Sequence, residues 1–171
     1  WAAMKGRDAL EVTWNKGINA DYNSLAYNND MLKRVKTKGK VRRENGQVDK
    51  AFGKAKKIVE ADYSVPLISH SPMETPCALA HFHDNACDVW APVQDPQGVR
   101  KSLAAALGID EKVVTVNITL LGGAFGRKSK PDFVVEAALI SRNIGSPVKI
   151  LWTREDDLQH DFYHFGSAQF L

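Results

Sequence analysis

Apolar and polar residues alternate along much of the chain after about residue 57, which is the pattern of half-buried β-strands. The run ALAHFHDNACDVW, residues 78–90, alternates on both sides of Asp84-Asn85 and predicts a β-hairpin that turns at this pair. In this register Phe82 lies opposite Cys87. The two cysteines, Cys77 and Cys87, are then kept apart, and we expect no disulfide between them.

The residues after the hairpin switch between helical and strand periodicity. Asp95 caps a helix whose apolar face ends at Gly108, and residues 113–121, VVTVNITLL, predict a strand. Residues 131–145 are apolar nearly all round, like a buried helix, and residues 148–156 predict a last strand. The expected fold class is α+β (mixed α/β), a β-hairpin followed by helix, strand, glycine loop, helix and strand. A strand, crossover helix and strand are most often parallel neighbours in a sheet.

The first 57 residues have a different texture. A helix end is expected near residues 1–10 and a short strand at 10–14, followed by turn-rich sequence. Residues 33–57 hold 11 of the 23 Lys and Arg residues. A basic stripe of this kind can bind nucleic acid, but it carries one aromatic residue and no nucleic-acid motif, so we favour a solvated linker and surface helix.

The composition narrows the class of protein further. The chain is 44% hydrophobic and 25% charged, as in ordinary globular domains. No apolar run approaches the roughly 18 residues that a membrane span needs, so no transmembrane segment is expected. The chain begins with Trp1 and not with methionine, and we expect it to be a piece of a longer protein.

The most informative stretch is LLGGAFGRKSKPD, residues 120–132, between the predicted strand and the buried helix. We call residues 122–128 of this stretch the glycine loop. Glycines at such a junction allow left-handed backbone and bring N–H groups close to an anion or oxo group. Neither the P-loop nor the Rossmann pattern fits, because Arg127 and Ala124 stand where those motifs need glycine. A tight turn without a ligand remains the alternative.

Two other clusters are weaker candidates for chemistry. His81 and His83 form an H-x-H pair, but in the hairpin register His81 lies opposite Asp88, and we expect a cross-strand polar pair and no metal site. Acidic residues and histidines gather near the end of the chain, where we expect an acidic turn entering a strand: Asp156, Asp157, His160, Asp161 and His164.

The stretch from APVQD at residue 91 to REDD at residue 157, with its GGAFG sequence, resembles the molybdenum-cofactor-binding region of the xanthine dehydrogenase and aldehyde oxidase family. SHSPMETP at residues 69–76 makes it most similar to the isoquinoline 1-oxidoreductase beta subunit within that family. The resemblance implies three segments. Residues 1–20 are the end of the preceding domain, 21–57 a basic linker and surface segment, and 58–171 the first part of the molybdenum-cofactor-binding domain.

The resemblance also implies roles for individual residues. Gln94 matches a glutamine whose amide hydrogen-bonds an oxo ligand of molybdenum. Phe125 and Gly126 match a dipeptide whose backbone approaches the metal and its pterin. The loop is expected to bend at Gly122 and Gly123, and Ala124 completes the expected cofactor-binding stretch. From its charge alone, and not from the resemblance, Arg127 is expected to meet the cofactor's phosphate. No residue is expected to ligate the metal directly.

Departures from the family pattern carry information too. Ala124 replaces the middle glycine of the commoner GGGFG, so we expect it to have an ordinary backbone conformation. Ser129 replaces a glutamate of the xanthine-oxidising members, which argues against a purine substrate of that kind. The catalytic general-base glutamate is expected downstream of Leu171, so no catalytic residue is expected in this chain and the isolated piece should be inactive.

The family resemblance finally implies partners. The parent is expected to be a molybdopterin-dependent oxidoreductase that hydroxylates an N-heterocycle or aldehyde with water-derived oxygen. Its cofactor is expected to be molybdenum-molybdopterin in the cytosine dinucleotide form, with iron-sulfur clusters in a small partner subunit. The bacterial periplasm is the expected compartment, with the cytoplasm as the alternative.

Two further expectations come from the residues themselves. Self-association of the piece is expected, and the alternative function is a phosphate- or nucleic-acid-binding module using residues 33–57 and the glycine loop.

Overall fold

The computed structural model describes residues 1–61, 63–163 and 169–170. The chain divides into two compact units, one formed by Pro66–Gly166 and the other by Trp1–Val65 with Ser167–Leu171. The domain boundaries expected from the sequence remain predictions. Each unit is described here by itself.

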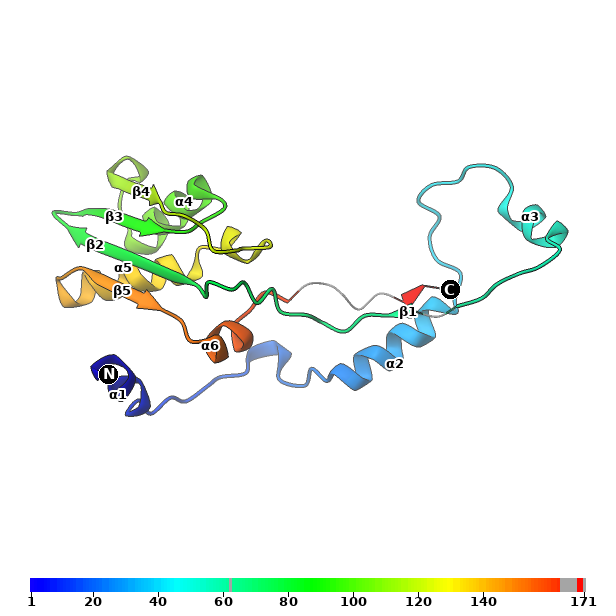
Figure 1. The fold of residues 1–171 in the computed structure, drawn as a ribbon, viewed down its shortest axis with the longest axis horizontal. Coiled ribbons are helices and arrows are strands. Elements are labelled where there is room, and N and C mark those ends of the chain that lie inside the picture. The colour runs from blue at the N-terminus through cyan, green and yellow to red at the C-terminus, as the bar shows by residue number, and fades with distance from the viewer. Residues whose placement is uncertain (62, 164–168, 171) are drawn as a thin grey trace. The chain divides into compact units, whose positions relative to one another are not determined.

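A four-stranded sheet forms the centre of the unit Pro66–Gly166 (Figure 1). Its strands in spatial order are β4 (Val114–Ile118), β3 (Ala86–Ala91), β2 (Cys77–His83) and β5 (Val148–Leu151). β2 pairs antiparallel with both β3 and β5, whereas β3 pairs parallel with β4. Phe82 lies opposite Cys87 and both cysteines are free, so the predicted hairpin register is confirmed.

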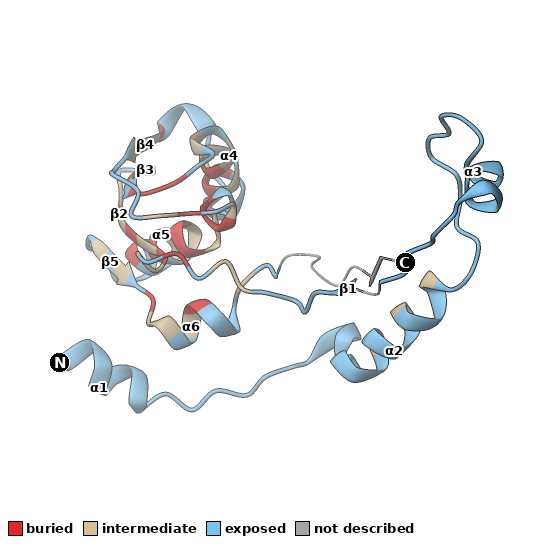
Figure 2. Ribbon diagram, turned by 45° about the vertical axis from the view of Figure 1, so that its right-hand side comes forward, coloured by how far each residue is buried: buried red, intermediate tan, exposed pale blue. Residues whose placement is uncertain are grey.

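Two helices, α4 (Pro96–Leu107) and α5 (Asp132–Ile144), pack against each other and against the sheet. The buried residues lie between these helices and the strands (Figure 2). Small side chains such as Ala78 and Ala80 on β2 let the helices come close, and Leu103 and Phe133 are fully buried against them. Alternate residues of each strand therefore face this core, as the alternating sequence predicted.

The helix boundaries follow from the capping residues. The side chain of Asp95 accepts a hydrogen bond from the Gly98 N–H at the start of α4. Gly108 and Gly145 end α4 and α5 with left-handed backbone, at φ 69° and 66°. Both helices were predicted with these ends.

One topological expectation is wrong. The strands on either side of α5, β4 and β5, run in the same direction but are not neighbours, because β3 and β2 lie between them. The parallel crossover between neighbouring strands is made instead by α4, which connects β3 to β4. The hairpin occupies the middle of the sheet, so the chain has to add β4 and β5 at opposite edges.

The acidic stretch near the end is a helix, and the expected turn entering a strand is also wrong. After β5 the chain forms α6 (Arg154–Gln159). Thr153 caps this helix: its side chain accepts from the Asp156 N–H while the Asp156 carboxylate accepts from the Thr153 N–H, a reciprocal capping box. His164 lies outside the described residues. The 3₁₀ turns of this unit are η2 (Glu111–Val113) and η3 (Arg127–Ser129).

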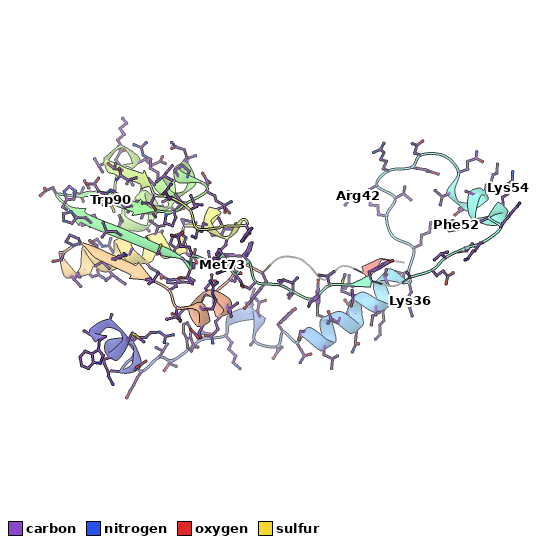
Figure 3. All side chains as sticks on the ribbon, in the orientation of Figure 1. Lys36, Arg42, Phe52, Lys54, Met73 and Trp90 are labelled. Carbon is purple, nitrogen blue, oxygen red and sulfur yellow. The ribbon has the colours of Figure 1, made fainter. Side chains whose placement is uncertain are left out.

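The other unit contains short helices and a short strand pair. They are α1 (Ala2–Asp8), η1 (Gly17–Asn19), α2 (Ser24–Val35), α3 (Val48–Lys54) and the strand pair β1 (Tyr63–Ser64) with β6 (Gln169–Phe170). The short strand expected at residues 10–14 is wrong, because this segment has no regular structure. Residues 33–57 are solvent-exposed except for Val35, as Figure 3 illustrates for Lys36, Arg42 and Lys54. Among the described residues no helix is long and apolar enough to cross a membrane.

Candidate functional site

The glycine loop follows β4 and has an unusual backbone. Gly123 and Gly126 have φ values of 102° and 103°, and Phe125 has φ 55°. Ala124 is not among the residues with positive φ, so its expected ordinary conformation is confirmed. A phenylalanine held in left-handed backbone is strained, and strain of this kind concentrates where a site needs a particular loop shape. Its side chain is 69% exposed at the apex of the loop.

The loop carries backbone donors that find no acceptor among the described residues. In the described part of the chain, the N–H groups of Gly123, Ala124 and Phe125 donate to no acceptor. Ala124 is nonetheless buried, with 7% of its surface exposed. Successive N–H groups beside left-handed residues form a concave site for an anion or an oxo group. The loop therefore offers consecutive donors to an electron-rich ligand.

Gln94 is attached to this loop from the segment between β3 and α4. Its side-chain Oε1 accepts a hydrogen bond from the Gly126 N–H at 3.1 Å, and its backbone N–H donates to the Lys128 carbonyl at 3.0 Å. Because the carbonyl end of the amide faces Gly126, the NH₂ end remains for donation to a ligand. The structure thus brings Gln94 and Gly126 together, although 32 positions separate them in the chain.

The opposite end of the loop is held by Glu74. The Gly122 N–H donates to Glu74 Oε2 at 3.0 Å, and the Glu74 N–H donates to the Gly122 carbonyl at 3.0 Å. The same carboxylate forms an ion pair with Lys128, whose side chain is fully buried. Burial alone would raise the pKa of Glu74, but the hydrogen bonds from Lys128 and Gly122 outweigh it and hold this pKa below its ordinary value.

Arg127 is also fully buried. Its guanidinium makes two parallel hydrogen bonds to Asp132, at 2.9 and 2.7 Å. It also lies 5.2 Å from the ring centres of both Trp152 and Phe162. The phosphate contact expected for Arg127 remains a prediction, and these protein partners give the guanidinium a second role in holding the loop to α5.

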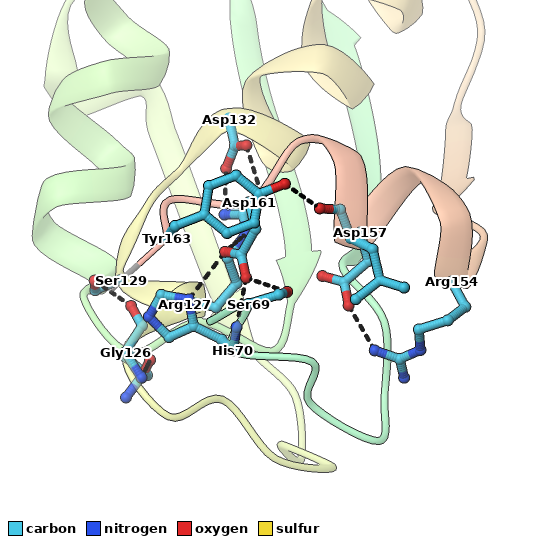
Figure 4. A network of polar contacts seen from close by, with 12 residues as sticks. Ser69, His70, Gly126, Arg127, Ser129, Asp132, Arg154, Asp157, Asp161 and Tyr163 are labelled. Carbon is cyan, nitrogen blue, oxygen red and sulfur yellow. Dashed lines mark hydrogen bonds and ion pairs between the residues drawn. The ribbon is translucent and has the colours of Figure 1, made fainter. Parts of the chain in front are cut away.

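Asp161 gathers the contacts behind the loop (Figure 4). Its fully buried carboxylate accepts hydrogen bonds from Ser69 Oγ and from the backbone N–H and Nδ1 of His70, and it pairs with Arg127 Nε at 3.2 Å. Burial raises the pKa of Asp161, but the hydrogen bonds from Ser69 and His70 outweigh it, so this pKa lies below its ordinary value. The His70 ring in turn lies against Gly126, where an added Cβ would stand 3.4 Å from Nε2.

Among the described residues no group of three His, Cys, Asp or Glu side chains is placed to hold a metal ion, and this includes the histidine pair of the hairpin. His81 lies opposite Asp88 as predicted, but it is His83 that bonds to the Asp88 carboxylate, at 3.0 Å. Hydrogen bonds to Asp88 and Asp84 raise the pKa of His83 above its ordinary value.

Sequence reasoning missed the residues that support the loop from a distance. Glu74 and Asp161 lie 54 and 34 positions from their cationic partners, Lys128 and Arg127. The only local signal was the pair of adjacent cations after Gly126, because two basic residues entering a buried helix need acidic partners. Which acids these were could not be read without the fold.

The comparisons with known proteins agree with the site. The model of the molybdopterin cofactor-binding domain family matches residues 27–164. The chain belongs to this family. Its relatives include the isoquinoline 1-oxidoreductase beta subunit of Brevundimonas diminuta, 34% identical over 73% of this chain and 16% of that protein. A membrane-bound aldehyde dehydrogenase [pyrroloquinoline-quinone] of Gluconacetobacter polyoxogenes is 33% identical over 98% of this chain and 22% of that protein.

Solved structures give the same result for the fold. The chain is similar to quinoline 2-oxidoreductase from Pseudomonas putida 86, with a TM-score of 0.56 and 28% identity over 65% of this chain and 14% of that one. The expected α+β fold, as a part of the cofactor-binding domain of a molybdenum hydroxylase large subunit, is confirmed. The chain spans about a fifth or less of the length of these relatives.

The residues present fit a molybdopterin cofactor. The group brings oxo and phosphate acceptors, and the loop supplies N–H donors at Gly123, Ala124 and Phe125 that are not used within the described chain. The Gly126 N–H is taken by Gln94, so of the dipeptide Phe125-Gly126 it is Phe125 whose N–H remains for a ligand. A molybdopterin cofactor-binding domain is the class that this fold and site define.

Proposed function

We propose that this chain is the part of a molybdenum hydroxylase large subunit that holds the metal end of the cofactor. The observation that carries the proposal is the run of N–H donors at Gly123–Phe125 that meet no acceptor in residues 1–61, 63–163 and 169–170, beside the anchored amide of Gln94. When bound, molybdenum-molybdopterin supplies the redox chemistry of hydroxylation. The chain's own residues supply orientation.

Gln94 and the glycine loop have separate tasks in this proposal. The Gln94 amide, oriented by the Gly126 N–H, donates from its NH₂ group to an oxo ligand, a contribution of the oxyanion-hole type. The backbone of Gly123–Phe125 donates to the cofactor, and the exposed Phe125 ring covers it from the loop apex. Gly122 admits the close contact with Glu74 at the start of the loop, and Arg127, paired with Asp132 and Asp161, is proposed to hold the loop in place beside the cofactor's phosphate.

The whole enzyme is proposed to hydroxylate an N-heterocycle or an aldehyde with oxygen from water, because the relatives' names point to such substrates. Electrons are proposed to pass to an iron-sulfur small subunit. The cytosine dinucleotide form of the cofactor, a periplasmic location and a general-base glutamate outside this chain complete the proposal. The 171-residue piece by itself is expected to be inactive.

The test is elemental analysis of the full-length protein, purified with its partner subunit from the native host. About one molybdenum per large subunit is expected, because one loop and one Gln94 serve one cofactor. Gln94→Ala should then lower kcat/KM by about 10²–10³-fold, the size of a lost oxyanion donor. Ser102→Ala, at a half-buried position in α4 remote from the loop, is the control and should leave kcat/KM unchanged.

A folded protein without molybdenum, from cells able to make the cofactor, contradicts the proposal. One relative carries pyrroloquinoline-quinone in its name, so the same preparation should also be examined for that quinone by absorption and mass spectrometry. A stoichiometric quinone without molybdenum would replace the metal cofactor in the proposal.

A further inference from the structure

We infer that Glu74 is a positioning residue for the glycine loop: its carboxylate joins the two ends of the loop and thereby keeps the donors at Gly123–Phe125 in place. The identity of the ligand to which these N–H groups donate rests on the proposed function. The positioning of the loop by Glu74 does not depend on that identity.

The contacts of Glu74 reach both ends of the loop. At the first end, Glu74 and Gly122 exchange backbone and side-chain hydrogen bonds, each of 3.0 Å. At the last end, the buried ammonium of Lys128 binds the oxygen Oε2 that also accepts from Gly122. A single carboxylate oxygen therefore closes the loop between Gly122 and Lys128.

Close approach makes Gly122 necessary for this closure. A Cβ at Gly122 would stand 2.7 Å from the Glu74 Cβ, closer than real Cβ contacts. Gly122 has no positive φ, so the need for glycine here comes from the contact with Glu74 and not from backbone strain. The two-glycine start of the loop thus serves two different purposes, since Gly123 is needed for its φ of 102°.

Charge burial makes the loss of either partner of this ion pair unequal in cost. The Lys128 side chain is fully buried, whereas the Glu74 side chain is 32% exposed. An ammonium that loses its partner in such a place is costly, while the carboxylate left by loss of the lysine still reaches water. Removing the acid should therefore disturb the loop more than removing the base. A preorganised loop also loses less conformational entropy when it binds its ligand.

The experiment uses the full-length protein with its partner subunit, and hydrogen exchange read by mass spectrometry on loop peptides. The amides of Gly126 and Arg127 are followed because they donate to Gln94 Oε1 and to the Ala124 carbonyl, and not to Glu74. Glu74→Gln should speed their exchange by about tenfold or more, and Lys128→Met by less. Molybdenum content after dialysis should fall in the same order.

Ser141→Ala is the matched control. Ser141 is fully buried in α5, accepts from the Phe82 N–H and donates to the Ser146 carbonyl, so its loss lowers the melting temperature without touching the loop. Exchange at Gly126 and Arg127 should stay within about twofold of wild type. Unchanged exchange in both Glu74→Gln and Lys128→Met, or equal acceleration in Ser141→Ala, overturns the inference. A wild type without molybdenum refutes the proposed function, and the exchange rates still decide this one.

Discussion

At the scale of single residues, the site depends on two adjacent buried cations. Arg127 and Lys128 are both fully buried, and each is neutralised by acids from other segments: Asp132 and Asp161 for the first, Glu74 for the second. Ion pairs of this kind add little net stability, but the loss of one partner is costly because it leaves a buried charge. Their value is that they fix where the loop lies.

Asp161→Asn tests this on the stability of the protein. The change removes the charge that faces Arg127 Nε and weakens the bonds from Ser69 and His70, while Asp132 keeps part of the compensation. The free energy of unfolding should fall by about 3 kcal/mol, measured by urea denaturation. Asp84→Asn, at a fully exposed hairpin position, should change it by less than about 0.5 kcal/mol. Equal losses in the free energy of unfolding for the two changes would show that the buried charge of Asp161 contributes no more to stability than an exposed one.

His83 gives the protein a pH dependence that is remote from the loop. Its pKa is raised above 6.5 by Asp88 and Asp84. A raised folded-state pKa means that the stabilisation is fully present below about pH 6.5 and is lost as the pH rises through the raised value. The melting temperature of wild type should therefore exceed that of His83→Gln by more at pH 6 than at pH 9. A difference that is constant or grows with pH contradicts the pairing.

At the scale of elements, the glycine loop differs from the helix ends, although both contain glycines with positive φ. Gly126 and Gly145 both have positive φ, but an added Cβ meets the His70 ring only at Gly126 and open space at Gly145. Gly145→Ala should cost about 1 kcal/mol from strain alone. Gly126→Ala should cost more, and only this change should reduce molybdenum retention in the full-length protein. Equal retention in both variants would show that the His70 contact is irrelevant to the site.

The helices and strands themselves were largely predictable, because local sequence patterns determine where they begin and end. Alternation around Asp84-Asn85 fixed the hairpin, and Asp95, Gly108 and Gly145 fixed the helix ends through capping. The loop position was readable from its glycines. The positive φ of Phe125 was not, because a strained residue is held by the surrounding fold and not by its own preference. The helix α6 was missed because its capping residues, Thr153 and Asp156, were assigned to the end of the strand predicted at residues 148–156, which in the structure ends at Leu151.

At the scale of the unit Pro66–Gly166, the spatial order of the strands in the sheet could not be predicted from the sequence. Both edge strands follow helices, and local patterns do not say which edge a strand joins. The same long-range information decides the supports of the site, since Glu74 and Asp161 meet the loop only after the sheet has placed the segments that precede β2 and follow α6. Prediction from sequence therefore reached the loop but not what holds it.

The sheet also exposes an apolar strip on the face that α4 and α5 leave uncovered. On β2, Leu79 lies opposite Trp90 of β3 and opposite Lys149 of β5. Leu151 follows Lys149 by two residues on β5, so its side chain points to the same face of the sheet. Trp90 is 40% exposed and Leu151 is 67% exposed. Because large exposed apolar strips on sheets promote association, the 171-residue chain should self-associate in solution. The double change Trp90→Lys with Leu151→Lys should lower its weight-average mass in sedimentation equilibrium.

Ile144→Lys is the control for that experiment, because Ile144 is 59% exposed at the end of α5 and lies off the sheet face. A lysine there adds the same charge per substitution without changing the strip. If the control reduces the mass as much as the double change, net charge and not the sheet face governs association. If neither does, the strip is not the contact.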